Sequence, residues 1–191
     1  MSIPLEPYAS TELPLVHNKK IRHIVWNRSG DKLVSCGEDK LVCVWDVEKA
    51  VLRQSLFGHS SRVTCGCWSM SDQLATCSRD HTVIVWDLFS ATAKFVFRFN
   101  NALSAIQWHG QDKLIIGDEK GNLFAGKAGD GVRFDKIHIG KSQVVEIAQS
   151  ENHGLIFVAY ANGAVQFFQI RWRSANICSS KKFVALPFVT T

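Results

Sequence analysis

The sequence predicts an all-β protein built from repeated four-stranded sheets, and three observations carry this prediction. Tryptophans recur with a period of about 41 residues. Short runs rich in Val, Ile, Phe and Trp are separated by polar residues or Gly, which is typical of strands and turns. No proline occurs between residues 15 and 186, so a continuous strand-rich body follows a proline-containing leader.

The tryptophan period consists of two interleaved series. Trp26, Trp68 and Trp108 lie 42 and 40 residues apart. Trp45 and Trp86 lie 41 residues apart, and each is followed by an aspartate, Asp46 or Asp87. Two series that share one period indicate tandem structural repeats.

Each repeat is expected to form short antiparallel strands. The first repeat has apolar runs at 21–26, 32–37, 41–47 and 51–57, the second at 62–68, 73–78, 82–88 and 93–99, the third at 103–108, 113–118, 122–128 and 132–139, and the fourth at 144–149, 154–160 and 164–170. Four short strands in a period of this length match one blade of a β-propeller. We therefore expect a leader at 1–14, blades at about 15–57, 58–99, 100–139 and 140–170, and a basic tail or the start of a further blade at 171–191.

The repeats resemble the WD-repeat family. The resemblance rests on Gly58-His59 opening the second repeat, Asp80 in its third turn and Trp86-Asp87 ending its third strand, with Asp39 and Trp45-Asp46 at matching offsets in the first repeat. It covers residues 15–170 and weakens along the chain. It implies a propeller of WD-repeat type, in which rings commonly have seven blades.

The resemblance also implies a structural hydrogen-bond network within the second repeat. Its expected members are His59, Ser78 (or Thr76), Asp80 and Trp86. A buried indole N–H needs an acceptor, and a hydroxyl can accept it while donating onward to an imidazole held by a carboxylate. A hydrolytic triad is the competing interpretation, but the indole would occupy the hydroxyl and no Gly-x-Ser-x-Gly motif is present.

The other repeats depart from this set. The first lacks Gly-His, and His17 is the candidate to stand in for its histidine. The third has Lys120 at the aspartate position and Gly126 at the tryptophan position, while the fourth has Asn162 and Phe168. Only the second repeat carries every member, so the outer blades are expected to depend on apolar packing.

Charge and cysteine content limit the possible functions. The net charge is +5, but residues 171–191 hold four basic residues and no acid, so the first 170 residues hold 18 basic and 17 acidic residues, a net charge of +1. A nearly neutral body does not match a protein that neutralises a phosphate backbone. Five of the six cysteines lie in predicted strands, and Cys65-Gly-Cys67 has no second pair at zinc-ligand spacing. We expect buried thiols, no metal, no cofactor, no targeting or membrane segment, and a cytoplasmic or nuclear location.

The repeat count predicts an incomplete or open ring, because the length gives about four and a half blades. Residues 181–191 fall where the first strand of a fifth blade is expected, and residues 13–16 could be an outer strand of a missing blade. Three accounts remain open: a fragment, short isoform or truncated form of a longer propeller; a partial propeller completed by another chain; or a small ring of its own.

The predicted function is a non-catalytic protein–protein interaction scaffold, a subunit of a larger complex. Loops on one rim of the blades are the candidate partner-binding surface. Its candidate residues are Lys19, Arg62, Arg79, His81, Lys120 and Lys141. The alternative is a subunit of a ribonucleoprotein or chromatin complex that contacts nucleic acid through basic rim and tail residues. No phosphate-binding Gly loop, paired carboxylates or metal motif favours an enzyme.

Overall fold

The chain forms an all-β structure of four separate sheets. We analysed a computed structural model that describes residues 13–150, 155–173 and 176–184, with side chains described for 13–150 and 155–170. This part of the chain holds sixteen strands in four four-stranded antiparallel sheets. None of the described segments is a helix of the length and apolarity needed to cross a membrane.

Every sheet is built from four consecutive strands. Blade one holds β1 (Ile21–Trp26), β2 (Lys32–Gly37), β3 (Val42–Asp46) and β4 (Val51–Leu56). Blade two holds β5 (Val63–Trp68), β6 (Leu74–Ser78), β7 (Thr82–Asp87) and β8 (Thr92–Arg98). Blade three holds β9 (Leu103–His109), β10 (Lys113–Asp118), β11 (Leu123–Lys127) and β12 (Asp135–His138). Blade four holds β13 (Val144–Gln149), β14 (Leu155–Tyr160), β15 (Val165–Arg173) and β16 (Asn176–Val184).

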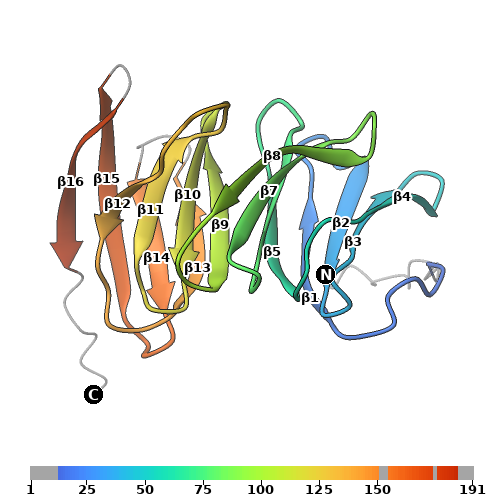
Figure 1. The fold of residues 1–191 in the computed structure, drawn as a ribbon, viewed down its shortest axis with the longest axis horizontal. Coiled ribbons are helices and arrows are strands. Elements are labelled where there is room, and N and C mark those ends of the chain that lie inside the picture. The colour runs from blue at the N-terminus through green and yellow to red at the C-terminus, as the bar shows by residue number, and fades with distance from the viewer. Residues whose placement is uncertain (1–12, 151–154, 174–175, 185–191) are drawn as a thin grey trace, which may run out of the picture.

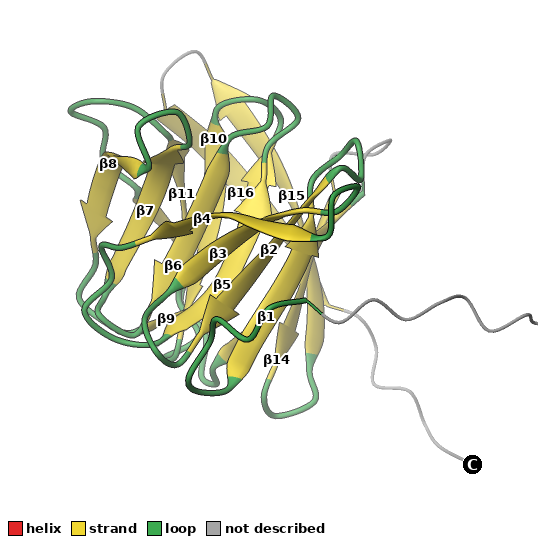
Figure 2. Ribbon diagram, turned by 90° about the vertical axis from the view of Figure 1, so that its right-hand side faces the viewer, coloured by secondary structure: helices red, strands yellow, loops and turns green. Residues whose placement is uncertain are grey.

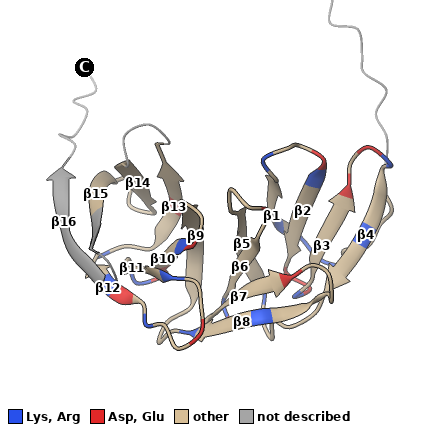
Figure 3. Cartoon of the chain, turned by 90° about the horizontal axis from the view of Figure 1, so that it is seen from above, with Lys and Arg blue, Asp and Glu red and all other residues tan. Residues whose placement is uncertain are grey.

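The blades follow one another across the molecule (Figure 1), and the described residues consist of strands and loops (Figure 2). Seen from above, β1, β5, β9 and β13 line the inner side of an arc, and β4, β8 and β12 lie on its outer side (Figure 3). Blade one and blade four stand at opposite ends with a gap between them. The predicted fold class, an incomplete propeller, is confirmed, and the account of a small closed ring is wrong for the described residues.

The end of the chain differs from the sequence-based expectation. Residues 181–184 do not start a fifth blade, because they belong to β16, which pairs with β15 as the fourth strand of blade four. The sequence pattern missed this strand because Asn176–Val184 mixes Ser and Lys with apolar residues, as an outer edge strand can. Residues 185–191 lie outside the described part. Residues 13–16 form no strand, since no neighbouring sheet offers them a ladder partner.

The hydrophobic core lies between the sheets, as three clusters that each join two neighbouring blades. The cluster between blades one and two packs Val34, Val42 and Val44 against Trp68 and Trp86. Equivalent clusters join blade two to blade three and blade three to blade four. Each blade therefore has two faces, one toward the preceding blade and one toward the following blade. We call these the N-side face and the C-side face.

Candidate functional site

One edge of the arc gathers the loops that the sequence proposed as a rim. In each blade, the backbone N–H of the turn between the second and third strands donates to a carbonyl just before the first strand. The four bonds are Glu38 N to Lys20 O at 2.9 Å, Arg79 N to Arg62 O at 3.1 Å, Glu119 N to Ala102 O at 2.9 Å and Ala161 N to Gln143 O at 2.9 Å. Two loops per blade are thus fixed side by side, which brings the predicted rim residues onto one surface.

The rim turns share a left-handed residue. Lys40 and His81 have φ values of 74° and 69°, and Gly121 and Gly163 occupy the same turn position with φ values of 87° and 82°. Residues with a Cβ adopt this conformation at a cost. The turn geometry is therefore common to all four blades, but only blades three and four have the residue that adopts it without strain.

The predicted rim residues divide into two groups. Lys19, His81, Lys120 and Lys141 are exposed. In contrast, Arg62 Nη1 lies 3.9 Å from Glu38 Oε1, and Arg79 Nε donates to Glu119 Oε1. Each of these two pairs joins one blade to the next, so the two arginines already hold carboxylates of this chain.

A hydrogen-bonded network crosses blade two from the rim to the third strand. The Trp86 indole N–H donates to Thr76 Oγ1 at 2.9 Å, and His59 Nε2 lies 2.8 Å from the same hydroxyl. His59 Nδ1 lies 3.0 Å from Asp80 Oδ2. A hydroxyl that accepts from the indole can donate to Nε2, which leaves the Nδ1–H to donate to Asp80. Each buried polar group then has a partner.

Ser78 was the first choice for the hydroxyl in this network, but Thr76 occupies that place. Thr76 pairs with Ile84, two residues before Trp86, so the indole reaches Thr76 diagonally across the two strands. Ser78 lies two residues after Thr76, on the same face of the strand and at the end of β6. Its hydroxyl donates to Arg62 O at 2.8 Å and accepts from Asp80 N at 3.0 Å. It fixes the rim turn instead.

Asp80 is held as a carboxylate by these contacts. Burial alone would raise the pKa of Asp80, but hydrogen bonds from His59 and Thr82 and from Ser60 N hold it well below its usual range. Thr76 is completely buried and its oxygen accepts from Trp86. This hydroxyl is therefore closed off from solvent and already occupied by the indole N–H.

Blade one contains a second complete network, although the full set of residues was expected in blade two alone. His17 Nδ1 lies 2.9 Å from Asp39 Oδ2, and its Nε2 lies 2.8 Å from Ser35 Oγ. The Trp45 indole N–H donates to Ser35 Oγ at 2.8 Å. Ser35 precedes Trp45 by ten residues, as Thr76 precedes Trp86. That fixed offset is the signal that would have identified both hydroxyls.

Blade three replaces the network with a carboxylate–amide cluster. Asp118 is fully buried, and its Oδ2 accepts from Asn101 Nδ2 at 2.8 Å and from Asn122 Nδ2 at 2.6 Å. Lys120 stands where blade two has Asp80, and the carboxylate of blade three lies two residues earlier in the chain, at Asp118. In blade four, Phe168 is buried at the tryptophan position and Asn162 accepts a turn N–H at 3.2 Å.

The aspartates that follow the third-strand tryptophans play a separate local role. Asp46 Oδ1 accepts from Lys49 N at 3.0 Å, and Asp87 Oδ1 accepts from Phe89 N at 2.9 Å. Both carboxylates therefore fix the turn between the third and fourth strands of their blade.

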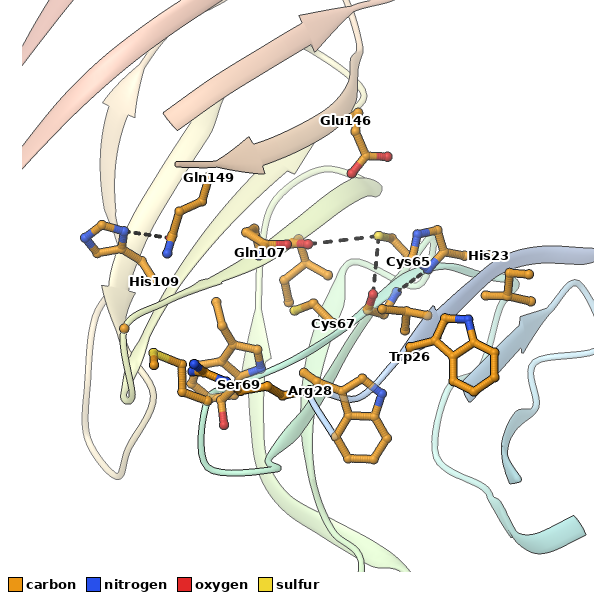
Figure 4. Close-up of a pocket in the computed structure, with 18 of the residues that line it drawn as sticks. His23, Trp26, Arg28, Cys65, Cys67, Ser69, Gln107, His109, Glu146 and Gln149 are labelled. Carbon is orange, nitrogen blue, oxygen red and sulfur yellow. Dashed lines mark hydrogen bonds between the residues drawn. The ribbon is translucent and has the colours of Figure 1, made fainter. Parts of the chain in front are cut away.

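The inner side of the arc forms a hollow of about 830 Å³ (Figure 4). Its labelled residues come from all four inner strands and include His23, Cys65, Glu146 and His109, whose Nδ1 lies 2.9 Å from Gln149 Oε1. Burial raises the pKa of Cys65 to about 12 and lowers the pKa of His23. A thiol with this pKa stays protonated, and no group of metal-ligating side chains occurs among the described residues. The hollow offers no reactive thiolate.

Comparison with known proteins agrees with this geometry. Residues 12–46 and 50–87 match the family described as WD domain, G-beta repeat. This match identifies blades one and two as WD40 repeats. Members of this family generally act as interaction scaffolds. The solved structure of U3-55K matches with a TM-score of 0.74 and 19% sequence identity, over 81% of this chain and 50% of U3-55K. The chain thus spans half the length of that relative, and the likeness concerns the fold. Comparison with curated proteins gives no significant match.

Proposed function

We propose that this WD40-repeat chain is a non-catalytic interaction scaffold, a subunit of a larger complex in the cytoplasm or nucleus. One observation carries the proposal: both ends of the arc present the residues that bury one blade against the next. Five free, buried cysteines support a reducing compartment.

The N-side face of blade one is uncovered. Ile24 is 59% exposed and Trp26 is 52% exposed. Their counterparts in blade three, Ile106 and Trp108, are 1% and 2% exposed because blade two covers them. An exposed apolar face with the composition of an internal junction is a binding surface for another sheet.

The C-side face of blade four is uncovered as well. Val165 is 49% exposed, whereas its counterpart Val42 in blade one is fully buried against blade two. Phe157 is also exposed, and its ring lies 5.7 Å from that of Phe167. A second chain that supplies further blades would cover both faces and complete the ring.

Light scattering on Ile24→Arg and Val165→Arg variants tests this assignment. We expect the wild-type chain to associate through its end faces and each variant to associate less, while Phe89→Arg, in an exposed turn of blade two, leaves association unchanged. A wild-type chain that is a stable monomer, and that captures partners equally well with and without these substitutions, contradicts ring completion.

The exposed rim residues Lys19, His81, Lys120 and Lys141 form the proposed partner surface. Charge reversal by Lys19→Glu and Lys120→Glu should reduce capture of a protein partner. The melting temperature should not fall, because neither side chain is in an ion pair among the described residues. Unchanged capture would remove the rim from the proposal. Capture of RNA that falls steeply with salt would favour the nucleic-acid alternative.

A further inference from the structure

A groove of about 440 Å³ opens between the outer strands of blades two and three. One wall consists of residues 96–99 of β8 and its following loop. The other wall consists of Phe124 on β11, residues 132–134, which lead into β12, and Lys136 on β12. In Figure 3, β8 and β12 lie on the outer side of the arc, opposite the inner strands that line the hollow. The groove is therefore a separate surface.

The floor of the groove is a cluster of phenylalanine rings packed edge to face. The Phe97 and Phe134 rings lie 4.9 Å apart at 69°, and the Phe99 and Phe124 rings lie 5.1 Å apart at 64°. Phe99 also lies 5.5 Å from Phe134. All four side chains are only partly buried, so this cluster keeps apolar surface available to a ligand.

The groove exists because blade three has lost the tryptophan of the repeat motif. Gly126 stands in its place, and a Cβ there would lie 2.7 Å from Cδ1 of Phe134. The Phe134 ring therefore enters space that a side chain at residue 126 would block. In blade two, Trp86 fills the equivalent position and packs against blade one. The replacement of the motif tryptophan by Gly126 therefore makes room for the Phe134 ring that lines the groove.

The lip of the groove is cationic. Arg98, Arg133 and Lys136 are exposed, and Lys136 Nζ lies 5.5 Å from the centroid of the Phe124 ring. Within the described residues none of these cations is in an ion pair, and no carboxylate lines the groove. Asp135 is adjacent, but strand alternation points it to the opposite face from Phe134 and Lys136.

We propose that this groove binds an acidic peptide segment that carries aromatic or branched apolar side chains. Half-buried rings accept the apolar side chains, and the three unpaired cations complement carboxylates that flank them. A nucleic acid fits less well, since the rings pack against one another edge to face and present few free faces for base stacking. The proposal adds a second binding surface and does not depend on ring completion.

The probe is a short fluorescent synthetic peptide in which Glu alternates with Phe and Leu. We expect it to bind the full chain and to bind at least about tenfold more weakly to an Arg98→Glu/Arg133→Glu variant. The matched control, Arg28→Glu/Arg53→Glu, makes the same charge change on exposed residues of blade one and should bind like the wild type. Two control peptides, with Gln for Glu or Ser for Phe and Leu, should each lose most of the affinity.

Three outcomes overturn the proposal: equal binding of the probe to both double variants, no binding to the wild type, or binding of a single-stranded RNA oligonucleotide in place of the peptide. Far-ultraviolet circular dichroism and melting curves show whether each variant is folded. Association through the arc ends, measured on the same variants by light scattering, should not change. A failure of the groove is therefore distinguishable from a failure of the proposed scaffold function.

Discussion

Blades one and two carry the same hydrogen-bonded network but differ in what covers them. In both, an imidazole joins a rim aspartate to a buried hydroxyl that accepts an indole N–H. Blade two lies between two neighbours, so Trp68 at the end of its inner strand is only 9% exposed. Trp26, at the same position in blade one, has no neighbour on that side. The network forms within a single blade, whereas burial of the inner-strand tryptophan requires a neighbouring blade.

The largest expected difference between the two blades is at these tryptophans. Trp68→Ala should lower the free energy of unfolding by about 3–5 kcal/mol, because it leaves a cavity between two sheets. In the monomeric chain, Trp26→Ala should lower it by about half as much, because Trp26 is 52% exposed and less of its ring is buried. Urea unfolding of both variants measures the difference. Equal losses would mean that the N-side face of blade one is covered in solution.

The networks should contribute equally in the two blades. His59→Ala and His17→Ala each remove the group that joins a buried hydroxyl to a carboxylate, which should cost about 1–3 kcal/mol and lower the melting temperature. Differential scanning calorimetry provides the measurement. Wild-type melting for His59→Ala would refute the structural role of the network. A much smaller loss for His17→Ala would show that the end blade is loosened.

The blade-two network should also make stability depend on pH. The pKa of Asp80 in the folded state is held below its usual range, so the unfolded chain binds the proton first as the pH falls. The stabilising contribution is therefore complete above about pH 5 and is lost toward more acid pH. The stability difference between the wild type and Asp80→Asn should shrink between neutral pH and about pH 3. A constant difference would contradict the assignment.

The smallest expected effect lies in the rim turns. Lys40→Gly and His81→Gly replace strained left-handed residues and should each stabilise their blade by about 0.5 kcal/mol. Gly121→Ala is the opposite case, since its Cβ would lie 2.3 Å from Ser142 O, and it should destabilise blade three. Chemical denaturation of the three variants tests both signs. Destabilisation by His81→Gly would indicate that the histidine side chain makes a contact of its own.

The sequence predicted the parts of this structure that repeat. The 41-residue period of Trp45 and Trp86 predicted about four four-stranded blades, and the described residues form four such sheets because every strand of a blade is local in the chain. The sequence pattern did not distinguish Thr76 from Ser78, because both lie on one face of β6. Only the structure shows that the Trp86 indole extends diagonally across the strands to Thr76. The polar fourth strand, β16, had no apolar pattern to reveal it.

Features that depend on neighbouring blades were harder to predict. Trp26 and Trp68 belong to one tryptophan series, and the exposure of Trp26 follows from the position of blade one at the end of the arc. Arg62 and Arg79 were among the rim candidates, but only the arrangement of the blades shows that Glu38 and Glu119 pair with them. The phenylalanine groove likewise combines two blades, and Gly126 was the one sequence sign of it.

The half-exposed Trp26 gives the protein an internal optical reporter. Trp45, Trp68, Trp86 and Trp108 are buried, so among the tryptophans with described side chains only Trp26 meets water. Its emission should be red-shifted and accessible to iodide quenching. A partner that covers blade one would shift this emission to shorter wavelength and protect it from iodide, which would reveal ring completion without any label.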